Sequence, residues 1–289
     1  MFGTFEWAQL EPGQFAHDRK TVDLDALALD RSTFSLGFKA RSSPREGSTF
    51  VTVAGDRETQ ARWFGNKLGY GHIAGSDGAL DVTTTGPSAF YSVVLDRERL
   101  AKQFHGVEVQ RIDAEGGVHI LEDAEHAGSL RLYIRALLRN YDRTIDESKA
   151  ALHASIRHTL LPLIALTLEE RVSESSPRAF SRRVLAVRKC EEFVIEHIDS
   201  NPSLLDLSKI SGFRLRSLIN AFRAVTGLSP MAYLKRQRLN AVRRALVEAD
   251  PTSTRIIDVA ANWGFWHMGH FTADYRALFG ETPSETLKR

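Results

Sequence analysis

Short apolar segments separated by turn residues fill the first 125 or so residues of the chain. Phe34, Leu36 and Phe38 alternate with smaller or polar neighbours, and Ala89–Leu95 is a compact apolar run. Alternation with a period of two, and apolar runs of this length, are typical of β-strands. Turn pairs separate these segments: Ser43-Pro44, Gly47-Ser48, Asp77-Gly78, Gly86-Pro87 and Gly116-Gly117. The pattern predicts several short strands in a sandwich or a small barrel.

Two amphipathic helices are predicted after the strands, because the apolar residues then recur every three or four positions. The first stripe comprises Leu130, Tyr133, Ile134, Leu137, Leu138 and Tyr141, and the second comprises Leu152, Ile156, Leu160, Leu163, Ile164 and Leu168. Pro162 lies within the second stripe and should kink or divide that helix. We expect both helices to pack within this chain, with dimerisation as an additional use of their surfaces.

A polar segment, Glu169–Arg183, interrupts the helical pattern and contains Ser-Ser-Pro. This composition is typical of a linker. Beyond it, every periodic segment has helical spacing. The sequence therefore predicts a first domain over residues 1–170, a linker over 171–183 and a helical domain over 184–289.

The helical part contains an internal repeat. The segment DLSKISGFRLRSLINAFRAVTGLSP starts at Asp206, and DVAANWGFWHMGHFTADYRALFGETP starts at Asp258. Equivalent residues lie 52 apart up to the Gly-Phe pair and, after one inserted residue, 53 apart beyond it. Each copy predicts a short helix, a turn, and a second helix that ends at Gly with Pro three residues later. This is the plan of a helix-turn-helix, whose second helix inserts its N-terminal part into the major groove of DNA.

A long helix is predicted between the two copies, from Ser229-Pro230 to about Val247. About 18 residues at ~1.5 Å each give a rod of roughly 27 Å, close to the ~34 Å at which major grooves recur on one face of B-DNA. One rigid helix therefore suits two reading units in successive grooves. We expect some of its cations to face phosphates: Lys235, Arg236, Arg238, Arg243 and Arg244.

The formal net charge of +2 hides an asymmetry. Residues 178–289 hold 18 Lys and Arg against 11 Asp and Glu, a balance of +7, whereas residues 1–177 have a balance of −5. A basic helical part behind an acidic part indicates that the helical part meets a polyanion. A chance excess of solvated arginines is the alternative that charge alone leaves open.

The rest of the composition predicts a cytoplasmic protein without a membrane partner. Cys190 is the single cysteine, which suits a reducing compartment. The first residues lack the basic start and apolar stretch of a signal peptide. The longest strongly apolar run, Leu160–Leu166, has seven residues, far fewer than the ~20 of a spanning helix.

The two repeats, the junction GLSP at Gly227–Pro230 and the closing FGETPSE at Phe279–Glu285 resemble the AraC/XylS family of bacterial transcription regulators. The resemblance covers roughly Leu185–Arg289. It implies an α+β protein in which a β-rich, cupin-like barrel with two amphipathic helices precedes an all-α domain with two helix-turn-helix units. It also implies an activator that binds double-stranded DNA as a homodimer and contacts RNA polymerase. The first domain would then sense a small-molecule effector, bind a partner protein or only mediate dimerisation.

For the first helix-turn-helix, the resemblance implies contacts to DNA from the exposed face of its second helix. The positions carried over are Arg214, Arg216, Ser217, Ile219, Asn220 and Arg223. Arg216 suits guanine O6 and N7, and Asn220 suits adenine N6 and N7. Arg223 is better placed for a phosphate, which sets register without reading sequence. Arg214 stands where Ser or Thr usually caps the helix, so the cap must come from elsewhere or be lost.

For the second unit, the positions carried over are His267, Met268, Gly269, His270, Thr272, Ala273 and Arg276. Gly269 and Ala273 stand where relatives often carry long polar side chains. We therefore expect this unit to contribute more affinity than specificity. Gly269 would also permit a close approach of the helix backbone to DNA.

The run GFWHMGH, which begins at Gly264, also suggests a metal site or an aromatic pocket. His267 and His270 have suitable spacing, but a metal needs more ligands, and Asp274 is the only acidic residue within a turn. The aromatic residues Trp263, Phe265, Phe271 and Tyr275 are interpreted as core. Trp266 is also assigned to the core, with the DNA backbone as the alternative.

No catalytic motif stands out in the first domain. Its histidines are scattered without a His-x-His pair, and neither a Gly-rich phosphate loop nor a Gly-x-Ser-x-Gly elbow occurs. We predict no enzymatic activity, no metal and no cofactor. The alternative function is a cupin-like enzyme with the helical domain as an accessory, which would require a bound metal and turnover.

Overall fold

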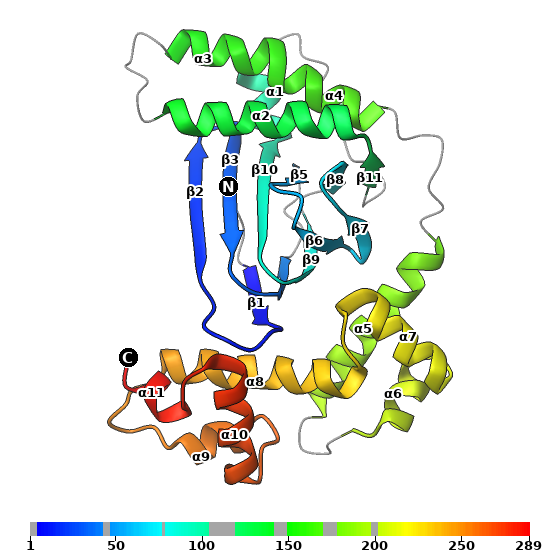
Figure 1. Ribbon diagram of the computed structural model, residues 1–289, viewed down its shortest axis with the longest axis vertical. Helices are drawn as coiled ribbons and strands as arrows, with labels where there is room; N and C mark the ends of the chain where they lie inside the picture. The colour runs from blue at the N-terminus through cyan, green and yellow to red at the C-terminus, as the bar shows by residue number, and fades with distance from the viewer. Residues whose placement is uncertain are drawn as a thin grey trace. The chain divides into compact units, whose positions relative to one another are not determined.

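The computed structural model describes residues 5–42, 47–76, 79–103, 119–141, 149–169, 178–197 and 202–289. Two compact units divide the chain. A strand-rich unit comprises residues 1–6, 17–35 and 40–176, and a helical unit comprises residues 7–16, 36–39 and 177–289. The expected fold class is confirmed, because strands dominate the first unit and seven helices of the described residues follow in the second (Figure 1).

The described strands form two sheets. Their strand orders are β1-β4-β9-β6-β7 and β11-β8-β5-β10-β3-β2. The strands are β1 Phe5–Gln9, β2 His17–Asp23, β3 Leu27–Phe34, β4 Phe38–Ser42, β5 Ser48–Ala54, β6 Gln60–Trp63, β7 Asn66–Leu68, β8 His72–Ser76, β9 Leu80–Thr85, β10 Ser88–Asp96 and β11 His119–Glu122. In the larger sheet, Val93 of β10 lies opposite Leu29 of β3 and Val51 of β5. The apolar run predicted as a strand is therefore the middle of this sheet.

Helix α2, Ala124–Asn140, covers the larger sheet (Figure 1). Asp123 caps it, because its carboxylate accepts hydrogen bonds from the N–H groups of Glu125 and His126. Most of the predicted apolar stripe faces inward, and Leu130 and Ile134 join a core with residues of β3, β5 and β10. Tyr141, at the end of the stripe, is exposed. Burial of this stripe, more than helix propensity, holds α2 in place.

The second predicted helix is divided before its proline. It consists of α3 Lys149–Ser155, a π-helical turn over Ile156–Leu160, and α4 Leu161–Glu169. The N–H of Leu161 donates to the carbonyl of Ile156, five residues earlier. Because Pro162 has no N–H to donate, a wider turn at this place keeps the neighbouring carbonyls bonded. The prediction that Pro162 kinks or divides the helix is confirmed.

One short helix lies within the region predicted as strands. Helix α1, Arg97–Gln103, buries Leu100 and carries an ion pair between Glu98 and Lys102 one turn apart. Seven residues are too few for a periodic signal to stand out from the flanking strand pattern. The stretch from 104 to 118 lies outside the described residues.

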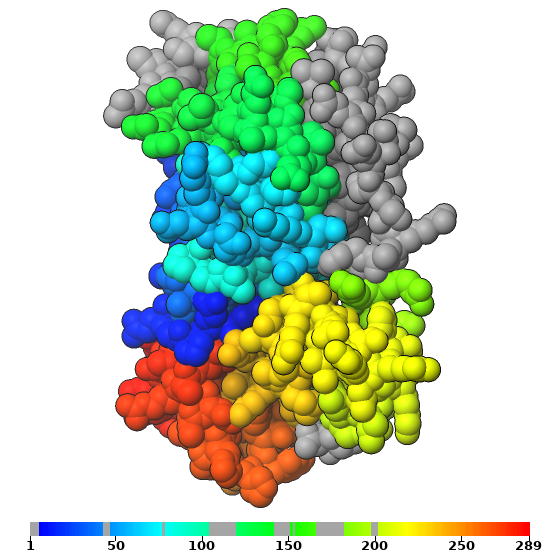
Figure 2. Space-filling view, turned by 45° about the vertical axis from the view of Figure 1, so that its right-hand side comes forward, coloured from blue at the N-terminus to red at the C-terminus, as the bar shows by residue number. Residues whose placement is uncertain are grey.

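The helical unit contains two small cores joined by one long helix. Its helices are α5 Arg178–Glu196, α6 Leu204–Ser211, α7 Leu215–Thr226, α8 Pro230–Glu248, α9 Ile256–Ala261, α10 Met268–Phe279 and α11 Pro283–Leu287. Tyr233 and Leu234 of α8 pack with α5, α6 and α7, whereas Val242 and Leu246 pack with α9, α10 and α11. Figure 2 shows the surface of this unit in yellow-green to red, with the first core's helices beside the second's.

Helix α5 begins at Arg178, inside the range expected for the linker. Residues 170–177 of that range lie outside the described residues. Within the described ranges, no helix is long and apolar enough to cross a membrane.

Candidate DNA-binding surface

The first helix-turn-helix consists of α6, the turn at Gly212 and α7. A capping box starts α6, in which the N–H of Asp206 donates to Ser203 Oγ at 3.3 Å and Ser203 N–H donates to the Asp206 carboxylate at 3.0 Å. Gly212 ends it in the left-handed conformation, with φ of 71°. The Ser208 hydroxyl donates to the Phe213 carbonyl at 2.6 Å and holds the turn. The angle between α6 and α7 is thus fixed by local hydrogen bonds.

Helix α7 has a buried face and an exposed face, as its spacing predicts. Leu218, Phe222 and Val225 are buried in the first core. The predicted contact residues Arg214, Arg216, Ser217, Asn220 and Arg223 are exposed, and Ile219 is half-buried. Among the described residues, none binds the side chain of Arg216 or Asn220. Both polar groups therefore face solvent and are available to a ligand.

The second helix-turn-helix consists of α9, the turn at Gly264 and α10. Gly264 has a φ of 75°, and the N–H of Phe265 donates to the Ala260 carbonyl at 3.0 Å. Phe265 packs against Phe271, with ring centroids 5.1 Å apart. The core assignment of Phe271 and Tyr275 agrees with their burial, and Trp263 and Phe265 pack against the same core.

Trp266 is not a core residue, and its assignment to the core was wrong: 61% of its surface is exposed. The segment between the turn and α10 is extended, since His267 has φ of −106° and ψ of 94°. Side chains alternate in direction along extended backbone. Phe265 points into the core, so Trp266 points away from it.

The second helices of the two units, α7 and α10, correspond residue for residue, and we refer to them as the recognition helices. Each has 12 residues, and α7 residue numbers plus 53 give those of α10. On a helix with 3.6 residues per turn, Arg216 and Asn220 lie at the centre of the exposed face. Their counterparts on α10 are Gly269 and Ala273, which are also exposed. The centre of the exposed face therefore carries two long polar side chains on α7, but only a glycine and an alanine on α10.

The remaining predicted contact residues of the second unit lie around Gly269 and Ala273. His267, His270 and Arg276 are exposed, and Met268 and Thr272 are half-buried. The rings of His267 and His270 lie 6.4 Å apart edge to face. Within the described ranges, no group of three or more His, Cys, Asp or Glu side chains is arranged to hold a metal ion.

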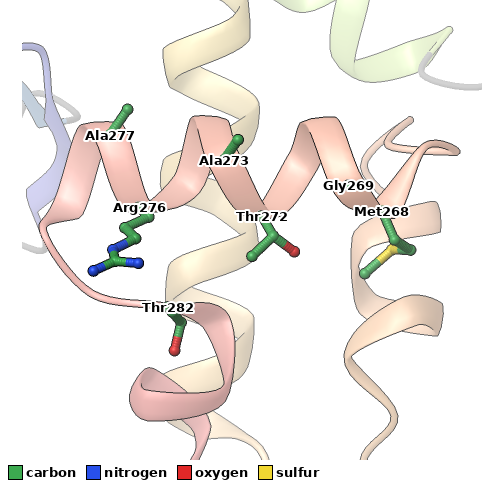
Figure 3. A pocket seen from close by; sticks show the side chains of 7 residues that line it. All are labelled: Met268, Gly269, Thr272, Ala273, Arg276, Ala277 and Thr282. Carbon is green, nitrogen blue, oxygen red and sulfur yellow. The ribbon is translucent and has the colours of Figure 1, made fainter.

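A groove with a volume of about 830 Å³ runs along α10. Its lining residues are Met268, Gly269, Thr272, Ala273, Arg276, Ala277 and Thr282. Figure 3 shows Met268, Thr272 and Arg276 on one side of the helix, and Ala273 and Ala277 on the other. Ala277 and Thr282 were not among the predicted contacts. The repeat offset could have indicated Ala277, because its counterpart Ala224 lies at the edge of the exposed face of α7.

Neither recognition helix has a side-chain cap. Arg214 and His267 occupy the N-cap positions of α7 and α10 without a side-chain hydrogen bond to the first turn. For α7, the helix cap is thus lost, as the sequence allowed. N–H groups left open at a helix start favour anions such as phosphates.

The cations of α8 have partners inside the helical unit. Lys235 pairs with Asp274, and Arg243 binds Glu281 at 3.1 Å. The guanidinium of Arg238 lies 5.7 Å from the centre of the Phe265 ring. The other two donate to backbone carbonyls of the segment over residues 7–16: Arg236 to Leu10, and Arg244 to Trp7. The expectation that some of these side chains face phosphates stays a prediction.

The closing FGETPSE motif holds the second core together. Gly280 ends α10 with a φ of 73°, and Thr282 and Glu285 form a capping box that starts α11 at Pro283. Glu281 accepts hydrogen bonds from Arg243 and from the Thr286 hydroxyl, and pairs with Arg289 at 3.1 Å. The motif thus fixes where α10 ends and what packs beneath it.

Comparison with known proteins agrees with this geometry. A model of a helix-turn-helix domain family matches residues 207–289. XylDLEGF operon transcriptional activator 2 of Pseudomonas putida is 33% identical over 126 residues, which cover 43% of this chain and 80% of that relative. The chain belongs to the AraC/XylS family of transcription regulators. The resemblance inferred from the repeats is therefore confirmed.

Other members of the family match over different shares of their length. XylDLEGF operon transcriptional activator 1 of Pseudomonas putida is 27% identical over 68% of this chain and 59% of the relative. Another relative from Pseudomonas putida, named XylDLEGF operon transcriptional activator without a number, is 32% identical over 42% of this chain and 38% of the relative. The chain thus spans less than two thirds of the length of these relatives. A solved structure from Rhodopseudomonas palustris, described as a probable AraC family regulator, is 39% identical over 36% of this chain and 95% of its own, with a TM-score of 0.32.

Proposed function

We propose that this protein is a sequence-specific transcription activator that binds duplex DNA with α7 and α10 in two successive major grooves. The observation that carries the proposal is the matched pair of 12-residue recognition helices, each with a buried apolar face and an exposed face. Helix α8 joins the two cores and has 19 residues, which corresponds to about 28 Å at ~1.5 Å per residue.

On α7, we assign sequence readout to Arg216 and Asn220. A bidentate pair from Arg to guanine or from Asn to adenine is worth ~1–3 kcal/mol of discrimination. Arg223 and Arg276 occupy equivalent positions one turn further along α7 and α10, where we assign them to phosphates. Arg214 and His267, at the uncapped helix starts, belong to the same phosphate-binding set.

The experiment that tests the proposal is affinity selection of random duplex DNA with the full chain. We expect one enriched, bipartite site. Arg216→Ala should relax base preference mainly at one position, and Asn220→Ala at another. Arg188→Ala is the matched control, because Arg188 is an exposed cation of the same unit that pairs with Glu192 on α5. Absence of an enriched sequence, or equal losses with Arg188→Ala, would contradict the proposal.

We assign the strand-rich unit to a small-molecule effector or a partner protein, and to homodimerisation. An effector acts only if it binds two arrangements of the protein with unequal affinity, so it must change the dissociation constant for the selected site. Leu137 and Leu160 pack in the core of this unit, whereas 66% of Leu132 on α2 is exposed. Leu132→Glu is therefore the variant to compare with wild type by light scattering, and loss of a dimer is the expected result.

The activator role is supported by the relatives in Pseudomonas putida, which are named as transcriptional activators. It implies RNA polymerase as a partner. Transcription in vitro from a promoter that carries the selected site should rise when the protein is added. A fall in transcript would identify a repressor instead.

A further inference from the structure

The groove on α10 presents few hydrogen-bonding groups to DNA. Over the first two turns, the groove is lined by Met268, Gly269, Thr272 and Ala273, and the exposed His270 lies beside it. Only Thr272 among them carries a hydroxyl, and none carries an amide or a guanidinium. The equivalent turns of α7 carry Arg216 and Asn220, so the contrast lies within one molecule.

The major groove of DNA offers one apolar group to a protein, the 5-methyl of thymine. Ala and the methyl of Thr are side chains that contact it. A helix with a bulky face would be held away from the base edges, whereas Gly269 and Ala273 add at most one carbon to the centre of the face of α10. Apart from the two adjacent residues and the neighbouring backbone of α10 itself, no heavy atom of the described residues lies within 4 Å of a Cβ placed on Gly269, so this face is open to the ligand.

We propose that α10 specifies its half of the binding site by apolar contact with thymine methyl groups, chiefly through Thr272 and Ala273. This inference rests on the proposed function. It also revises the expectation that the second unit contributes affinity more than specificity. The shallow groove, whose lining includes Met268, Thr272 and Ala273, receives the methyl groups (Figure 3). Arg276, one turn beyond Thr272, lies where the sugar-phosphate backbone passes.

The test replaces thymine by deoxyuridine, one position at a time, in the selected site. Deoxyuridine pairs like thymine and keeps the same hydrogen-bonding groups, but it lacks the methyl. The half-site relaxed by Arg216→Ala identifies the α7 half, and the other half belongs to α10. Loss of one buried methyl should weaken binding of the full chain about fourfold at one or two positions of the α10 half.

Two variants connect the effect to named side chains. Thr272→Ser keeps the hydroxyl and removes the methyl of the side chain. In this variant, deoxyuridine at the contacted position should therefore cause almost no loss of affinity. Ala273→Asn restores the α7 residue at the equivalent position and should change the preferred base there. Circular dichroism confirms that each variant keeps its helices, and deoxyuridine effects in the α7 half should stay unchanged in both.

The outcomes separate this inference from the proposed function. A selected site whose α10 half tolerates every deoxyuridine with a change below about 1.5-fold overturns the methyl readout and leaves the regulator intact. Deoxyuridine effects that Thr272→Ser and Ala273→Asn leave unaltered also overturn it, because the methyl is then read by other residues. Failure to select any DNA site would contradict the proposed function itself.

Discussion

Lys235 of α8 forms an ion pair with Asp274 of α10. Asp274 lies at the edge of the exposed face of the second recognition helix, so its carboxylate would repel the DNA backbone if it were unpaired. The pair therefore neutralises a negative charge beside the proposed DNA-binding surface and holds α10 against α8. Exposed pairs of this kind contribute little to folding stability, about 0–1 kcal/mol.

Because Lys235 is paired within the protein, we expect it to contribute less than Arg223 to the salt dependence of DNA affinity. Each phosphate contact adds about 0.9 to the slope of log affinity against log salt concentration. Arg223→Ala should reduce the slope by about 0.9, because we assign Arg223 to a phosphate. Lys235→Ala combined with Asp274→Ala removes the neutral pair and should leave the slope nearly unchanged. Titration of the selected site between 50 and 200 mM salt measures both, and equal slopes for the two variants would contradict the assignment.

Glu281 is expected to stabilise the second core. Only 12% of its side chain is exposed, and it binds Arg243, Arg289 and the hydroxyl of Thr286. Removing a largely buried acceptor leaves its donors unsatisfied, at a cost of ~1–3 kcal/mol. Glu281→Ala should therefore lower the free energy of unfolding by about that amount, measured by urea denaturation. Glu192→Ala is the matched control, because Glu192 lies in an exposed pair with Arg188, and a change of equal size there would refute the role of Glu281.

Features of the fold that depend on local signals could be predicted from the sequence, whereas contacts between distant residues could not. Helix α8 was predicted from Pro230 to about Val247 and runs from Pro230 to Glu248, because proline and apolar spacing are local signals. The two helix-turn-helix units followed from the repeat. By contrast, the partners of the α8 cations are set by residues distant in sequence, such as Asp274 and Glu281. No local pattern shows that a lysine or arginine is already engaged.

Exposure of single aromatic residues was the weakest prediction. Trp266 and Phe265 are adjacent and similar in character, yet one is exposed and the other packs against Phe271. The direction of each depends on the backbone between the turn and α10, which composition does not reveal. The polar face of α7 was identified correctly as exposed, although Ile219 is half-buried. Its role in binding DNA stays a prediction.

Cys190 should be chemically inert in the folded protein. Burial raises the pKa of its thiol to about 12, so almost no thiolate exists at pH 8. The thiolate is the form that reacts with disulfide reagents. Because the chain has one cysteine, absorbance with a thiol-reactive disulfide reports on this side chain alone. We expect no rapid reaction in buffer and complete reaction in denaturant, and fast labelling of native protein would show that the first core opens.

The two capping boxes predict a loss of stability in acid. Hydrogen bonds from Ser203 lower the pKa of Asp206 below its ordinary 3.8, and those from Thr282 lower the pKa of Glu285 below its ordinary 4.5. A lowered pKa in the folded state means that the stabilisation is complete above the unfolded pKa and disappears as pH falls through the folded one. The melting temperature should therefore decline below about pH 4.5. Asp206→Asn combined with Glu285→Gln should flatten this decline, and an unchanged pH profile would exclude these two carboxylates as its source.

The missing cap of α7 allows stability and DNA binding to be separated. Arg214 occupies the N-cap position without a side-chain hydrogen bond to the first turn. Arg214→Ser supplies a hydroxyl that can cap the helix, worth about 1 kcal/mol, whereas Arg214→Ala removes the same charge without adding a cap. If the open N–H groups bind a phosphate, Arg214→Ser should unfold at a higher urea concentration than Arg214→Ala and bind the selected site more weakly. A serine variant that gains stability and binds DNA as well as the alanine variant would show that the helix start makes no phosphate contact.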